Sequence, residues 1–95
     1  MNEKKLGKLR QQVQDLRRKH GKGIRSRELE ALASKVGRER HPRGKEPNWV
    51  MVDATLRRPP LSIPNHPGDL KPATAKSILD VLDDDIHALA ERLEH

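Results

Sequence analysis

The chain has 95 residues, of which 33% are hydrophobic, 36% are charged and none is cysteine. That length predicts one small domain, and the lack of cysteine excludes disulfides and thiolate metal sites and fits a reducing cytoplasm. No apolar run reaches the ~18 residues of a membrane span, and the N-terminus lacks the apolar centre of a signal peptide. We therefore expect a cytoplasmic protein that has no membrane partner.

The charge is divided unevenly along the chain. Residues 1–58 hold 17 Lys and Arg against 7 Asp and Glu, a net charge of +10, whereas residues 59–95 hold 3 against 7, a net charge of −4. A basic first half predicts a polyanionic partner, most simply nucleic acid. The alternative is a solvated basic surface that serves solubility.

The first predicted helix covers residues 3–19. Its narrow apolar stripe is formed by Leu6, Leu9, Val13 and Leu16. This stripe either lies against the domain or is offered to a partner helix. Two glycines in residues 20–23 favour a break after the helix. Residues 1–23 are therefore expected to be a helical extension with a linker, followed by a domain at 24–92.

The second predicted helix covers residues 26–36. Its apolar positions, at helical spacing, are Leu29, Leu32, Ala33 and Val36. Ser26 is the expected N-cap and Gly37 the expected C-terminal stop.

Three short strands are predicted next, at 38–41, 49–52 and 61–63, from β-branched and aromatic content and from alternation. Pro59 and Pro64 lack an N–H for the sheet, so the third strand is expected at an edge or to be very short. The only aromatic residue of the chain, a tryptophan at the start of the second strand, either fills the core or stacks on a base.

A final helix is predicted from Pro72 to the end of the chain. Its apolar face is formed by Ala75, Ile78, Leu79, Leu82, Ile86, Leu89 and Leu93. Asp83, Asp84 and Asp85 point about 100° apart, so they cannot converge on one metal ion, and a solvated helix face is expected. Residues 93–95 resemble the start of an expression-vector tag. The order of elements predicts an α+β domain with a small antiparallel sheet.

Three stretches carry a family resemblance. They are RSRELEAL (25–32), IPNH (63–66) and LKPATAKSIL (70–79). The first stretch is similar to the opening of the family's first helix. The second is similar to a Val/Ile-Pro-x-His element at the end of a strand. The third is similar to a helix that begins Leu-Lys-Pro-Gly-Thr, with Ala73 in the glycine's place. Together they resemble the HicA family of toxins from bacterial type II toxin–antitoxin pairs, over residues 25–86.

The resemblance implies a double-stranded-RNA-binding-like α-β-β-β-α fold, here with an additional N-terminal helix. It implies a toxin that cleaves or blocks mRNA, and a cognate antitoxin protein as its partner. The family's key histidine stands in a Gly-Ser-His motif at the start of the second strand. Aligned on Gly44, that motif falls on Lys45 and Glu46, so the chain departs from the family there. A non-catalytic RNA- or protein-binding module of the same fold is therefore the alternative.

Metal-free RNA cleavage needs a base for the 2′-hydroxyl, an acid for the leaving oxygen and a cation for the charged phosphorane. Glu46 is the candidate base and Lys45 the candidate phosphate ligand. His41 is a candidate acid or base because imidazole titrates near neutrality. The alternatives are that Glu46 balances nearby arginines and that His41 is an ordinary surface residue. No metal or other cofactor is expected.

The candidate RNA contacts are basic side chains on the predicted turns, strand ends and final helix. They are Arg40, Arg43, Lys45, Arg57, Arg58, His66, Lys71 and Lys76. The two last lysines stand near a helix N-terminus, whose free N–H groups also favour phosphate. The set is expected to follow an RNA backbone by charge and shape. His66 either contacts RNA or braces its own loop.

Overall fold

A computed structural model describes residues 2–41 and 47–94. Within these ranges the elements are the helices α1 (Glu3–Arg17), α2 (Ser26–Lys35) and α3 (Pro72–Glu94), the strands β1 (Arg38–His41), β2 (Asn48–Met51) and β3 (Leu61–Ser62), and the 3₁₀ helix η1 (Ala54–Leu56). The strands form one antiparallel sheet in the order β1-β2-β3. The predicted α+β class is therefore confirmed.

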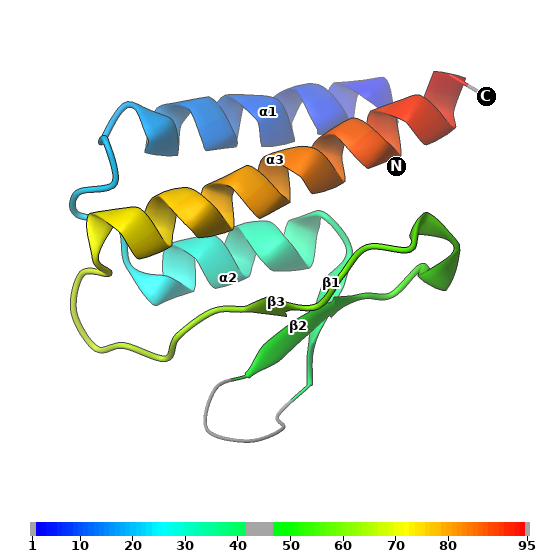
Figure 1. Ribbon diagram of the computed structural model, residues 1–95. Helices are drawn as coiled ribbons and strands as arrows, with labels where there is room; N and C mark the ends of the chain where they lie inside the picture. Colours follow the sequence, from blue (N-terminus) through cyan, green and yellow to red (C-terminus); the bar gives the residue numbers. More distant parts are fainter. Residues whose placement is uncertain (1, 42–46, 95) are drawn as a thin grey trace.

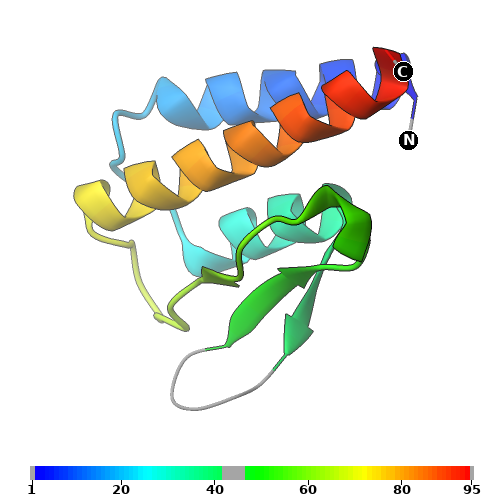
Figure 2. The same cartoon turned by 45° about the vertical axis from the view of Figure 1, so that its right-hand side comes forward.

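The helices α1 and α3 run antiparallel side by side, and α2 packs below them next to the sheet (Figure 1). The β1–β2 hairpin projects away from the helices, which is clearest in the turned view of Figure 2. The two ends of the chain lie at the same end of the α1/α3 pair. The core is one cluster that takes apolar side chains from all three helices and from the sheet.

The apolar stripe of α1 belongs to this core. Leu6, Leu9 and Val13 are buried, and Leu16 packs against the same cluster. Arg17 at the end of α1 adds an ion pair with Asp80 of α3 at 2.9 Å. The stripe is thus covered by α3 and α2 of its own chain, and the prediction that it is offered to a partner helix is wrong.

The sheet turns one face to the helices. Residues paired across neighbouring strands point to the same face of a sheet. The register pairs Arg40 with Trp49, and Trp49 with Leu61, so these three residues lie on the helix side. Trp49 is 8% exposed and lies in the core, as its core interpretation predicted. The next register row, formed by His41, Asn48 and Ser62, points to the other face.

Glycine 37 ends α2 as predicted. It has a φ of 104°, a left-handed conformation that costs glycine little. Its carbonyl accepts a hydrogen bond from the backbone N–H of Val52 at 3.0 Å, so the turn also connects α2 to the end of β2.

Asp53 connects η1 to the end of α3. Its carboxylate accepts hydrogen bonds from Thr55 and forms an ion pair with Arg92 at 2.7 Å. The Thr55 hydroxyl and backbone N–H, and then the Arg92 guanidinium, lower the pKa of Asp53. Because the folded pKa is depressed, this contribution to stability is present above the unfolded pKa of about 3.9 and is lost as the pH falls through the folded value.

Asp85 is the main departure from the predicted helix α3. It was expected on a solvated face, but its side chain is 0% exposed, so that prediction is wrong. Arg38 of β1, equally buried, forms two hydrogen bonds to it at 2.6 and 2.9 Å, and Arg58 forms a third at 2.7 Å. Helical geometry explains the placement, since Asp85 follows Ile78 by seven residues and Leu82 by three and so lies on the apolar face.

The remaining donors of the two arginines are also used. Arg38 Nη1 donates to the carbonyl oxygens of Trp49 at 2.7 Å and Pro59 at 3.0 Å. Arg58 Nη2 lies 3.4 Å from the carbonyl oxygen of Val81. A buried charge is tolerated when it is paired and hydrogen-bonded in this way. The cluster therefore ties α3 to β1, to β2 and to the segment before β3.

Replacing Asp85 by asparagine tests this cluster. The substitution keeps the shape but leaves the Arg38 charge uncompensated in the core, so we expect the free energy of unfolding to fall by about 3–5 kcal/mol. Asp84→Asn is the matched control, since Asp84 is the exposed neighbour, and a change within about 0.5 kcal/mol is expected. Urea unfolding followed by Trp49 fluorescence measures both, and equal losses would contradict the role of Asp85.

Candidate nucleic-acid interface

The predicted residues at the end of β1 lie on opposite faces of the sheet. Arg40 shares the helix side with Trp49, whereas His41 shares the outer side with Asn48 and Ser62. Both Arg40 and His41 are exposed. In this outer row the Ser62 hydroxyl donates to the Asn48 side-chain oxygen at 2.9 Å. His41 is thus the one titratable side chain of this row within the described residues.

The other predicted catalytic residues, Lys45 and Glu46, and the predicted RNA contact Arg43 lie outside the described residues. His41 is the catalytic candidate that the structure does describe. It stands directly before that segment, at the end of β1.

The loop that follows β3 is fastened to the start of α2 by Ser26. The Ser26 hydroxyl donates to the Pro64 carbonyl oxygen and accepts a hydrogen bond from the backbone N–H of His66 at 3.2 Å. Ser26 is the first residue of the helix, and Arg25 is the N-cap, so the predicted capping role of Ser26 is wrong. The segments RSRELEAL and LSIPNHPG meet at this serine.

The ring of His66 braces the same loop. Its Nδ1 accepts a hydrogen bond from the backbone N–H of Gly68 at 3.1 Å. A neutral imidazole that accepts at Nδ1 carries its proton on Nε2. Because His66 is exposed, Nε2–H is the ring donor left for a ligand. Bracing and ligand contact are therefore compatible at this residue.

A hollow of ≈ 230 Å³ lies between this loop and the start of α2, and we call it the loop hollow. Its lining residues are Arg25, Ser26, Arg27, Glu30, Asn65, His66 and Pro67. The hollow includes Ser26 and Arg27 from the first turn of α2, and a helix N-terminus together with cations favours a phosphate. Arg25 is partly engaged by Asp69 at 3.7 Å, whereas Arg27 is exposed and forms no ion pair within the described residues.

Sequence reasoning missed Arg25, Arg27 and Asn65 as site residues. The available signal was the pair of similar segments, which carry these residues beside the predicted Ser26 and His66. What the sequence did not contain was their contact, which joins positions 38 and 40 residues apart.

Lys71 and Lys76 lie at the start of α3, on the same end of the sheet as the loop hollow. Because neighbouring strands are antiparallel, the end of β3 lies at the same edge of the sheet as the start of β2 and the end of β1. Helix α3 begins ten residues after β3. Both lysines are exposed, and within the described residues neither forms an ion pair.

Arg57 and Arg58 lie at the other end of β3, so the structure divides the predicted RNA contacts into two groups. Arg57 is exposed and caps η1 with a φ of 52°. Arg58 is 21% exposed, and its guanidinium is bound to the buried Asp85. Its first role is therefore structural. The other RNA-contact candidates that the structure describes are Arg40 at the end of β1, His66 in the loop after β3, and Lys71 and Lys76 at the start of α3.

In residues 2–41 and 47–94, no three His, Asp or Glu side chains gather as metal ligands would. Over the same ranges, no helix has both the length and the apolar character that crossing a membrane requires.

Ser26→Ala tests the attachment of the loop to α2. The Pro64 carbonyl and the His66 N–H would lose their partner, so we expect the free energy of unfolding to fall by about 1–3 kcal/mol and the amide of His66 to exchange faster. Ser34→Ala, at an exposed position of the same helix, is the control and should be neutral or slightly stabilising. Unfolding by urea and amide exchange by NMR measure the pair, and indistinguishable variants would refute the attachment.

Comparison of the chain with protein-family models, with curated proteins and with solved structures found no match. The candidate interface is therefore defined by its own geometry, namely a hollow at the start of a helix with arginine, histidine and amide side chains around it.

Proposed function

We propose that the protein binds RNA through its sugar–phosphate backbone, as the toxin of a type II toxin–antitoxin pair. The observation that carries the proposal is the loop hollow, where the first residues of α2, among them Arg27, and the exposed His66 line one space. These groups suit a phosphate and hold no base-reading pattern. Lys71 and Lys76 add two exposed cations at the start of α3.

A double-stranded-RNA-binding-like arrangement is part of the proposal. Within the described residues, the order α2, β1, β2, β3, α3 follows the α-β-β-β-α pattern, and α1 is the addition. Recognition of an RNA helix by shape and backbone contacts needs no exposed aromatic residue. That requirement fits a chain whose only aromatic side chain, Trp49, lies in the core.

RNA binding is tested with a duplex of about 20 base pairs over a range of salt concentrations. We expect the affinity of the unaltered protein to fall steeply with salt, because bound phosphates release counterions. Arg27→Gln should weaken binding and reduce the salt slope by about 1. Arg57→Gln removes the same charge at the far end of β3, and a smaller effect is expected. An affinity that does not change with salt would refute the proposal.

RNA cleavage is the second candidate function, and it is favoured by the exposure of His41, which stands four residues before Lys45 in the sequence. In this mechanism His41 exchanges a proton with the 2′-hydroxyl or the leaving oxygen, and Glu46 takes the complementary role. Lys45 stabilises the charged phosphorane.

Incubation of RNA with the protein and with the His41→Ala and Glu46→Ala variants tests cleavage. Because acid–base catalysis contributes about 10²–10⁴-fold, we expect a loss of that size in at least one variant while duplex binding persists. Cleavage that both variants retain would refute the assignment of these residues. If the unaltered protein leaves the RNA intact, RNA binding without cleavage remains as the function.

The proposed antitoxin partner is tested by expression in cells. Induced expression should arrest growth, and co-expression of the neighbouring gene should restore it. Unimpaired growth at high expression would count against the toxin assignment and would leave the RNA-binding module.

A further inference from the structure

A second basic hollow lies between α1 and α2, away from the sheet. Its volume is ≈ 440 Å³, within the range of about 300–1,000 Å³ that ligand sites occupy. Its lining residues are Asn2, Lys4, Lys5, Lys8, Leu9, Gln12 and Lys35. We call it the lysine hollow. Four of its seven lining side chains carry a positive charge, and none is acidic.

The four lysines have no charge partner in the described part of the chain, where the ion pairs of α1 and α2 involve Arg17, Arg18, Lys19 and Arg25 instead. Lys4 and Lys5 also stand in the first turn of α1, the positive end of the helix dipole, where a cation is unfavourable. Helix stability therefore does not explain their placement. A bound anion would relieve both the dipole interaction and the mutual repulsion of the ammonium groups.

The lining groups select a phosphate ligand. Lysine acts as a flexible point charge, which suits phosphate oxygens, and the amides of Asn2 and Gln12 add neutral donors. No aromatic side chain is available for base stacking, because the only one in the sequence is the buried Trp49. Recognition here would therefore depend on the backbone rather than on the base.

Helix α2 connects this hollow to the loop hollow. Arg27, Ala31 and Lys35 are all exposed and follow one another at intervals of four, so they form one outer ridge. Arg27 lines the loop hollow and Lys35 lines the lysine hollow. Ten residues of helix span about 15 Å, a distance that an RNA backbone crosses within a few nucleotides.

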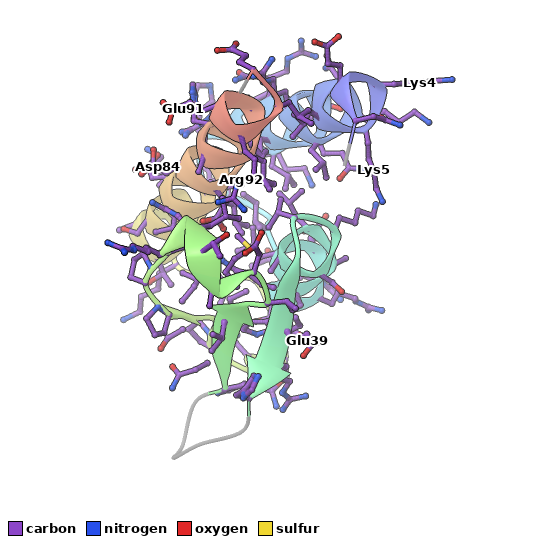
Figure 3. The ribbon with its side chains drawn as sticks, turned by 90° about the vertical axis from the view of Figure 1, so that its right-hand side faces the viewer. Lys4, Lys5, Glu39, Asp84, Glu91 and Arg92 are labelled. Carbon is purple, nitrogen blue, oxygen red and sulfur yellow. The ribbon has the colours of Figure 1, made fainter. Side chains whose placement is uncertain are left out.

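The charges on the opposite side favour the same path. Figure 3 shows Lys4 and Lys5 on α1 at one side of the molecule, and Asp84 and Glu91 on α3 at the other. Asp84 and Glu91 disfavour a phosphate backbone on their side, and the lysines of α1 favour it on theirs.

We propose that the bound RNA backbone runs from the loop hollow along α2 into the lysine hollow, so that α1 supplies a second set of phosphate contacts. This inference rests on the proposed RNA binding. It assigns a ligand-binding role to the part of the chain that lies outside the HicA-like segments.

The double variant Lys4→Gln/Lys8→Gln tests the inference with the same 20-base-pair RNA. We expect about tenfold weaker binding, as for two exposed ionic contacts, and a salt slope that falls by about 2. The control Arg10→Gln/Arg18→Gln removes one charge from α1 and one from its C-cap, both outside the lysine hollow, and its binding should stay within about twofold. The melting temperature of the lysine variant should be unchanged or slightly higher, because cations leave the helix N-terminus.

The possible outcomes separate this inference from the proposed function. Equal RNA affinities of the lysine variant and the control would overturn the lysine hollow as an RNA contact, even where Arg27→Gln weakens binding. If no variant or unaltered protein binds RNA, both proposals fail. Inorganic tripolyphosphate distinguishes the source of the phosphate: amide shifts in α1 caused by tripolyphosphate, with no effect of the lysine variant on RNA binding, would overturn the RNA assignment.

Discussion

The contact between Asp85 and two arginines holds the two halves of this fold together. One carboxylate from α3 receives Arg38 from β1 and Arg58 from the segment before β3, and carbonyl oxygens of Trp49 and Pro59 take further donors of Arg38. Such a cluster is specific because each donor needs a partner at a defined position in a low-dielectric core. It orients the sheet on the helices in a domain whose β3 strand has only two residues.

That orientation decides where the basic side chains gather. Because β3 is held antiparallel to β2, the chain enters β3 beside the arginine cluster and leaves it beside the start of α2. Arg58 binds the buried Asp85, whereas His66 reaches the first turn of α2. The outer ridge of α2 then lies between the two hollows, and Asp84 and Glu91 of α3 lie on the other side of the molecule from Lys4 and Lys5 (Figure 3).

Asp85 also shows which features of the structure a sequence pattern predicts and which it does not. The 100° step between helix residues correctly separates Asp83, Asp84 and Asp85, and the same step places Asp85 among Ile78, Leu82 and Ile86. The helical pattern alone therefore places Asp85 on the buried face of α3. A carboxylate on an apolar face is rarely buried without a partner, however. The partner, Arg38, stands in a strand of four polar residues, RERH, which offers no apolar alternation to show which face is buried.

By itself the sequence determined the helices, the approximate strands, the glycine stop of α2 and the uneven charge. These follow from periodicity and residue preference within a few neighbouring residues. Tertiary structure decided the burial of the α1 stripe, the partners of Asp85, the role of Ser26 and the division of the basic residues into separate groups. Those features depend on contacts between distant residues, such as Arg38 and Asp85, which are 47 positions apart. No local pattern encodes which distant groups meet, because the packing of the whole chain selects them.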